Sequence, residues 1–121
     1  MAMNYNPEER TISQLERDLI YFASEAEKKG SEWARSKSLF EQLEDLKKVT
    51  LADNTPDKGT IAEREKEGLR SDAYRQHLED LSDARFEMNK AYVHYQAAKD
   101  KFECVRTIVS NRREQLKRGI E

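Results

Sequence analysis

One stretch decides the fold of this chain: residues 72–118, DAYRQHLEDLSDARFEMNKAYVHYQAAKDKFECVRTIVSNRREQLKR. Large apolar residues recur in it at intervals of seven, namely Leu81, Met88, Tyr95, Phe102, Val109 and Leu116. An interval of seven returns a side chain to the same side of a helix every two turns, which is the pattern of helices that pack at shallow angles. We therefore expect one long helix over 72–118.

The first part of the chain carries the same interval. Its apolar residues are Ile12, Leu19, Ala26, Trp33 and Phe40, with Leu15, Phe22 and Leu43 three positions after members of that series. Asn6 and Pro7 are residue types that begin helices, so we predict a first helix over 7–52. The interval continues through Gly30, which favours an unbroken helix, with a kink at Gly30 as the alternative.

Between these two segments lies a short region of turn-forming residues. Residues 53–59, DNTPDKG, predict a bend, because the residue before a proline avoids helical geometry. Thr60 and Glu63 have the spacing of a capping box and predict a short helix over 60–68, with Gly68 as its left-handed end. Ser71 then offers a cap for the long helix.

These elements predict an all-α fold, an antiparallel hairpin of two long helices with a short helix at the bend. Three positions after the large residues of 72–118 lie Ala84, Ala91 and Ala98. Small residues there allow a second helix to approach closely. We expect a single domain over 1–121, with each long helix extending roughly 65–70 Å at about 1.5 Å per residue.

Six apolar residues lie beside the two main series and form a candidate face for a partner: Ile20, Leu39, Leu46, Leu78, Tyr92 and Ile108. Two helices alone do not cover so wide an apolar surface, and the short helix does not reach Ile20 or Ile108. We therefore expect self-association, most simply a dimer of hairpins that forms a four-helix bundle.

The composition bounds the class of protein. The chain has 22 basic and 24 acidic residues and a net charge of −2, which favours neither a nucleic-acid binder nor an acidic mimic of nucleic acid. The single cysteine excludes an intrachain disulfide and makes the cytoplasm the expected compartment. No stretch approaches the ~20 apolar residues that span a bilayer, so we expect no membrane contact.

The end of 72–118 is the densest basic segment. Its cations are Arg106, Arg112, Arg113, Lys117 and Arg118. They are a candidate contact for nucleic acid or an acidic partner. The competing hypothesis is structural, because cations favour a helix C-terminus and an antiparallel hairpin brings them near the acids of the first helix, Glu8, Glu9, Glu16 and Asp18.

No catalytic, metal or cofactor site is predicted. His77 and His94 lack the Glu-x-x-His spacing of di-metal bundles, and we expect His77 to pack against the partner helix. Cys104 has no sequence sign of an activating base. We expect a protein that is not an enzyme.

Residues 60–65 (TIAERE) and 71–78 (SDAYRQHL) resemble small all-helical proteins of tailed bacteriophages and prophages, often encoded beside single-strand annealing recombination genes. The resemblance implies a phage accessory factor that acts by binding in the host cytoplasm, most directly on a protein of DNA recombination or repair. Two other hypotheses are an inhibitor of a host nuclease or defence complex, and a structural coiled-coil spacer or assembly protein.

Overall fold

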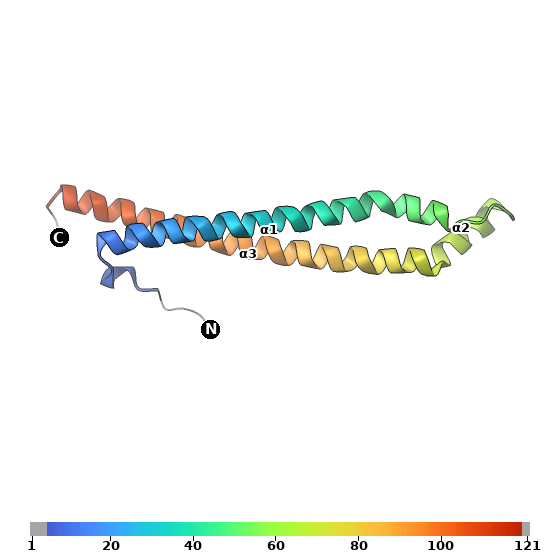
Figure 1. Ribbon diagram of the computed structural model, residues 1–121, viewed down its shortest axis with the longest axis horizontal. Coiled ribbons are helices and arrows are strands. Elements are labelled where there is room, and N and C mark those ends of the chain that lie inside the picture. Colours follow the sequence, from blue (N-terminus) through green and yellow to red (C-terminus); the bar gives the residue numbers. More distant parts are fainter. Residues whose placement is uncertain (1–4, 120–121) are drawn as a thin grey trace. The chain divides into compact units, whose positions relative to one another are not determined.

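The computed structural model describes residues 5–119 and is helical, with no strand among these residues (Figure 1). A short 3₁₀ turn, Pro7–Glu9, precedes the helices α1 (Ile12–Asp53), α2 (Ile61–Arg70) and α3 (Asp72–Lys117). The predicted all-α hairpin is confirmed, since α1 packs against α3. Residues 1–4 and 120–121 of the predicted 1–121 domain lie outside the described residues. None of the described helices is apolar over a length that would cross a membrane.

Helix α1 begins five residues later than predicted. Asn6 caps only the 3₁₀ turn, where its side chain accepts a hydrogen bond from the Glu8 amide, and Arg10 then adopts extended backbone angles. The cap of α1 is Thr11, whose hydroxyl accepts from the Gln14 amide while the Gln14 side chain accepts from the Thr11 amide. This reciprocal pair is a capping box, and it sets the start of α1 at Ile12.

Helix α1 continues without a break through Gly30, as the apolar interval favours. A Cβ atom at Gly30 would lie 3.1 Å from a ring carbon of Tyr95 in α3. The glycine therefore allows the Tyr95 ring to approach the α1 backbone closely. This close approach explains why a glycine stands at position 30, although glycine destabilises a helix by about 1 kcal/mol relative to alanine.

The bend and α2 match the prediction except at Gly68. Thr60 and Glu63 form the expected capping box, and the Ser71 hydroxyl accepts from the Tyr74 amide at the start of α3. Gly68, however, is helical, and α2 continues to Arg70. Gly68 is buried because α2 approaches the end of α1 there, with Thr55 as its nearest neighbour.

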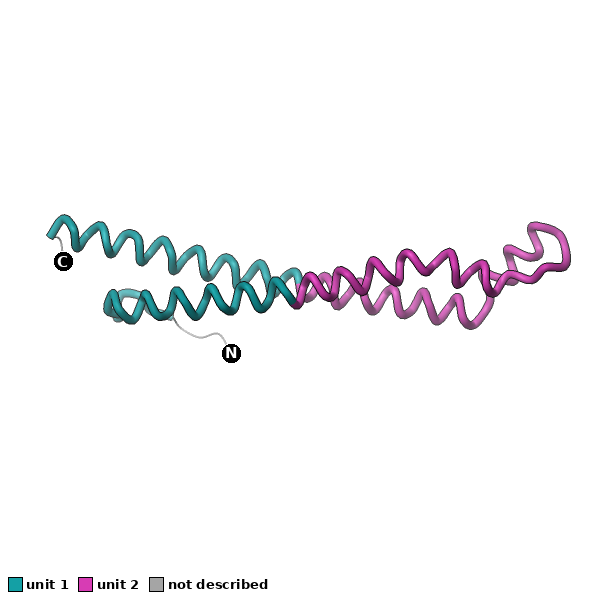
Figure 2. Tube along the Cα trace, turned by 45° about the horizontal axis from the view of Figure 1, so that its top comes forward, with its two compact units in different colours: residues 1–31, 92–121 teal, residues 32–91 magenta. Residues whose placement is uncertain are grey.

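The chain divides into two compact units (Figure 2). Unit 1 comprises residues 1–31 and 92–121, and unit 2 comprises residues 32–91. In unit 1 the core is a cluster of Leu15, Phe22, Val105 and Val109. The last turns of α3 extend past the start of α1 in this unit (Figure 2). Leu116, the last member of the predicted apolar series, lies in the last turn of α3 and is exposed.

In unit 2 the buried side chains come from the first turns of α3. They are Tyr74, His77, Leu81 and Ala84, and they follow the alternating three- and four-residue steps of the predicted series. His77 is 9% exposed and its Nε2 atom lies 2.6 Å from the Leu43 carbonyl oxygen of α1. The expected packing of His77 against the partner helix is confirmed.

Candidate functional site

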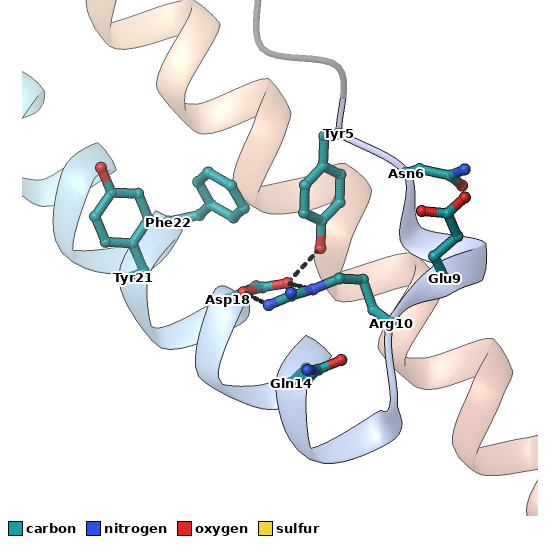
Figure 3. Close-up of a pocket in the computed structure, with 8 residues that line it drawn as sticks. All are labelled: Tyr5, Asn6, Glu9, Arg10, Gln14, Asp18, Tyr21 and Phe22. Atoms are coloured by element: carbon teal, nitrogen blue, oxygen red, sulfur yellow. Dashed lines mark hydrogen bonds and ion pairs between the residues drawn. The ribbon is translucent and has the colours of Figure 1, made fainter.

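The most developed polar site lies in unit 1, where the N-terminal segment folds back on α1 (Figure 3). Arg10 donates from Nε to Asp18 Oδ2 at 2.9 Å and from Nη2 to Asp18 Oδ1 at 2.6 Å, so the pair is bidentate. The Tyr5 hydroxyl donates to Asp18 Oδ2 at 2.8 Å. We call Tyr5, Arg10 and Asp18 the N-terminal cluster.

Aromatic packing holds the Tyr5 ring beside the core of unit 1. Its ring meets Phe22 edge to face, with centroids 5.7 Å apart and an interplanar angle of 88°. The Lys101 ammonium of α3 lies 4.9 Å from the Phe22 centroid and 5.9 Å from that of Tyr5. Both arrangements are attractive, because the face of an aromatic ring carries a partial negative charge that attracts the ammonium and the positive edge of another ring. The N-terminal segment therefore covers one side of the core of unit 1.

Beside this cluster is an open pocket of about 610 Å³. Its lining residues are Tyr5, Asn6, Glu9, Arg10, Gln14, Asp18, Tyr21 and Phe22 (Figure 3). Both carboxylate oxygens of Asp18 accept hydrogen bonds from Arg10 or Tyr5. The charges of Arg10 and Asp18 in this pocket therefore already pair with each other, and aromatic rings line another part of it.

The N-terminal cluster shifts two acid–base equilibria. Hydrogen bonds from Arg10 lower the pKa of Asp18 below its ordinary value of 3.8, because they stabilise the carboxylate. Burial raises the pKa of Tyr5 from 10.0 to about 12, and the hydrogen bond to Asp18 adds to the increase. Ionised Tyr5 would lose its hydrogen-bond donor and face the Asp18 carboxylate.

These shifts predict how docking of the N-terminal segment depends on pH. The Tyr5 contribution is complete below pH 10 and is lost as the pH rises toward about 12, because the folded state binds the phenolic proton more tightly. The Asp18 contribution is present above pH 3.8 and is lost as the pH falls through the lowered folded-state pKa.

A tyrosinate absorbance titration of the chain and of Tyr5→Phe measures the alkaline side. The difference between the two curves should show one group titrating near pH 12. In an Asp18→Asn background the same difference should move toward pH 10. Circular dichroism at each pH checks that the helices persist. An unshifted difference curve in the chain with Asp18 intact would contradict the cluster.

The basic end of α3 is largely paired within the chain. Arg113 lies 3.4 Å from Glu16 of α1, while Arg106 and Arg118 pair with Glu103 and Glu114 of α3 itself. Arg112 donates to the Arg10 carbonyl at 3.1 Å. The Lys117 side chain is exposed and makes no ion pair or hydrogen bond with the residues that the structure describes. The expected meeting with Glu16 occurs, whereas Asp18 binds Arg10 instead.

The six residues of the candidate apolar face do not share one environment. Five are exposed: Ile20, Leu39, Leu46, Leu78 and Tyr92. Ile108 is partly buried and packs against the core cluster of unit 1, where the N-terminal segment also packs through Tyr5. The structure thus uses Ile108 for its own core and leaves the other five at the surface.

Two other residues with reactive or metal-binding side chains, Cys104 and His77, do not line the pocket beside the N-terminal cluster. Cys104 is a free, exposed thiol. His77 uses both ring nitrogens on α1, with the Thr50 hydroxyl 3.4 Å from Nδ1 in addition to the Leu43 carbonyl. No group of three or more potential metal ligands occurs among residues 5–119.

The N-terminal cluster is the part of this site that the sequence analysis missed. The prediction placed Arg10 and Asp18 on one helix that begins at Pro7. Residues eight positions apart on a helix lie about 12 Å apart along its axis, so no contact between them was expected. The signal that identifies the cluster is Thr11 and Gln14, whose capping-box spacing ends the preceding segment at Arg10.

Comparison with known protein families, curated proteins and solved structures gave no match.

Proposed function

We propose that this chain is a non-enzymatic binding protein that acts by docking faces of its helices on other proteins. The observation that supports this most is the exposure of Leu39, Leu46 and Val49 of α1, which are 53%, 50% and 51% exposed on one helix within unit 2. Aliphatic residues repeated along one line of a helix, outside the packed seam, are the usual anchors of helix-face recognition.

We further propose that the chain forms a homodimer. Ile20 of unit 1 is 71% exposed although it lies beside the packed part of α1, and the N-terminal segment covers a different side. A second hairpin completing a four-helix bundle would remove such residues from water, at about 25 cal/mol per Å² of apolar surface buried.

The external partner that fits the resemblance to phage accessory proteins is a protein of DNA recombination or repair in the host cytoplasm. The internal pairing of Arg106, Arg112 and Arg113 supports a protein partner over nucleic acid. A phosphate backbone would have to displace these contacts before it could use their charge.

The solution mass from light scattering coupled to gel filtration tests this proposal. The expected result is a dimer near twice 14.2 kDa that does not change with salt or with added single-stranded DNA. A monomer would overturn the dimer, and large assemblies would favour a structural spacer instead. A salt-sensitive increase in mass with DNA would overturn the protein-binding function and make the basic end of α3 the primary site.

A further inference from the structure

The contacts of unit 2 define how α1 and α3 face each other there. His77 of α3 bonds the Leu43 carbonyl and lies beside Thr50, and the Arg85 guanidinium lies 5.3 Å from the Phe40 ring centroid. These contacts, with Leu81 and Ala84 buried, identify the seam between the two helices. The helices run in opposite directions and keep seven-residue repeats, so equivalent flanks of the two seams lie on the same side.

One flank of this seam is apolar on α1. Leu39 and Leu46 each come one position before a seam residue, Phe40 and Lys47, and they are seven residues apart. Val49 follows Leu46 by three positions and lies on the same side of the helix. Together they extend over about 15 Å of helix, which is two to three turns.

The equivalent flank of α3 is acidic. Asp80 and Glu87 each come one position before a seam residue, Leu81 and Met88, and Asp83 follows Asp80 by three positions. All three carboxylates are exposed, and Asp80 accepts a hydrogen bond from Gln76 of its own helix. We define the acidic apolar face of unit 2 as the apolar line of Leu39, Leu46 and Val49 with the adjacent carboxylates Asp80, Asp83 and Glu87.

The opposite side of unit 2 is basic on α3 and mixed on α1, where Glu41 and Glu44 lie among Lys37 and Lys48. Leu78 comes one position after the seam residue His77, and its neighbours along the same side of α3 are Arg75 and Arg85. Cations on the acidic side are Arg35 and Lys90, which lie away from Leu46 and Val49 toward the other end of the unit. The two sides of unit 2 therefore differ in charge and suit partners of different charge.

The charges of the acidic apolar face argue against a second copy of this chain as its occupant. A two-fold contact between two such faces would place the carboxylates of one copy against either the carboxylates or the aliphatic line of the other, and neither arrangement gives them cations to pair with. A contact between the acidic side of one copy and the basic side of the next would not close into a dimer. The complementary partner is a helix with an aliphatic line between lysine and arginine residues.

We propose that the acidic apolar face of unit 2 binds an amphipathic helix of a partner protein, whose aliphatic line packs on Leu39, Leu46 and Val49 and whose basic residues face Asp80, Asp83 and Glu87. This inference rests on the proposed function and names the face and the chemistry of the partner. The aliphatic line would supply most of the affinity, and the carboxylates would select the partner and its orientation.

The test uses the full chain and two synthetic amphipathic helical peptides, one with leucine and lysine and a matched one with leucine and glutamate. Fluorescence anisotropy should show binding of the lysine peptide and much weaker binding of the glutamate peptide. The pair Leu39→Asn and Leu46→Asn should weaken binding of the lysine peptide at least tenfold. Asp80→Asn, Asp83→Asn and Glu87→Gln together should weaken it and reduce its salt dependence.

Leu78→Asn is the matched control, because it makes the same change on the opposite side of the same unit. It should leave binding of the lysine peptide unchanged. An equal loss in Leu78→Asn, or equal binding of the two peptides, would overturn the inference. Circular dichroism and the solution mass of each variant show that it folds and assembles as the parent chain does. A normal solution mass with no face-specific peptide binding would refute this inference alone, whereas a DNA-dependent mass would refute the proposed function.

Discussion

Replacing Leu15 with alanine should lower the free energy of unfolding of unit 1 by about 2–5 kcal/mol, which is the range for a large aliphatic residue in a packed core. Leu15 is 0% exposed and belongs to the cluster of Phe22, Val105 and Val109. Its loss would leave a cavity between α1 and α3, where the long side chains on neighbouring turns cannot move to fill it.

The matched control is Val93→Ala, an aliphatic truncation in α3 of the same unit. Val93 is 63% exposed and belongs to no proposed interface, so its truncation should lower stability by less than about 0.5 kcal/mol. Urea unfolding followed by circular dichroism measures both variants, and hydrogen exchange should place the loss in Leu15→Ala within residues 5–31 and 92–119. Equal losses in the two variants would contradict the assignment of the seam in unit 1.

The second large effect is expected at Gly68. In Gly68→Ala the new Cβ atom would lie 2.5 Å from Thr55 Oγ1 and 3.2 Å from Leu51 Cδ1. Alanine favours a helix over glycine by about 1 kcal/mol, but forced overlap in a packed contact costs about 1–3 kcal/mol. Thr55 Oγ1 cannot rotate away freely, because it donates to the Leu51 carbonyl at 2.7 Å. We expect net destabilisation of unit 2.

A double-mutant cycle tests this cause. Thr55→Ala removes the overlapping oxygen and loses one hydrogen bond, at about 1 kcal/mol. If the overlap is the cause, the double variant Gly68→Ala with Thr55→Ala should be less destabilised than the sum of the two single variants. Urea unfolding of the four chains gives the coupling. Simple additivity, or a more stable Gly68→Ala chain, would contradict the close approach of α2 to α1.

Much of the fold follows from local sequence rules. The seven-residue series predicted which side of α1 and α3 is buried, because every two turns the same side of a helix returns to its partner. The capping box of Thr60 and Glu63 and the cap at Ser71 are short-range hydrogen bonds, so residue type and spacing were sufficient to place them.

Two features of the fold depended on contacts between distant residues. The start of α1 moved from Pro7 to Ile12 because Arg10 and Tyr5 bind Asp18, which makes an extended residue before the helix favourable. Gly68 stays helical because it packs on Thr55, whereas its residue type alone suggested a helix end. Neither contact has a periodic pattern in the sequence.

As a partner face, the six apolar residues remain a prediction, and the structure shows only where each of them lies. The sequence placed Leu39, Leu46 and Leu78 beside the seam, which exposure agrees with. It grouped them on one face, whereas the contacts of His77 place Leu78 on the flank opposite to Leu39 and Leu46. Which flank of α1 lies beside which flank of α3 depends on how the two helices pair, and the pattern of one helix alone does not show this.

Site-specific photo-crosslinking shows whether Leu46 meets a partner protein in the cell. A photoreactive phenylalanine derivative is placed at position 46 in one chain and at the adjacent exposed position 45 in another, in cells that naturally produce the protein. We expect a discrete adduct from position 46 and none from position 45, with a partner that mass spectrometry identifies and that contains a basic amphipathic helix. No adduct at 46, or the same adducts from both positions, would contradict this expectation.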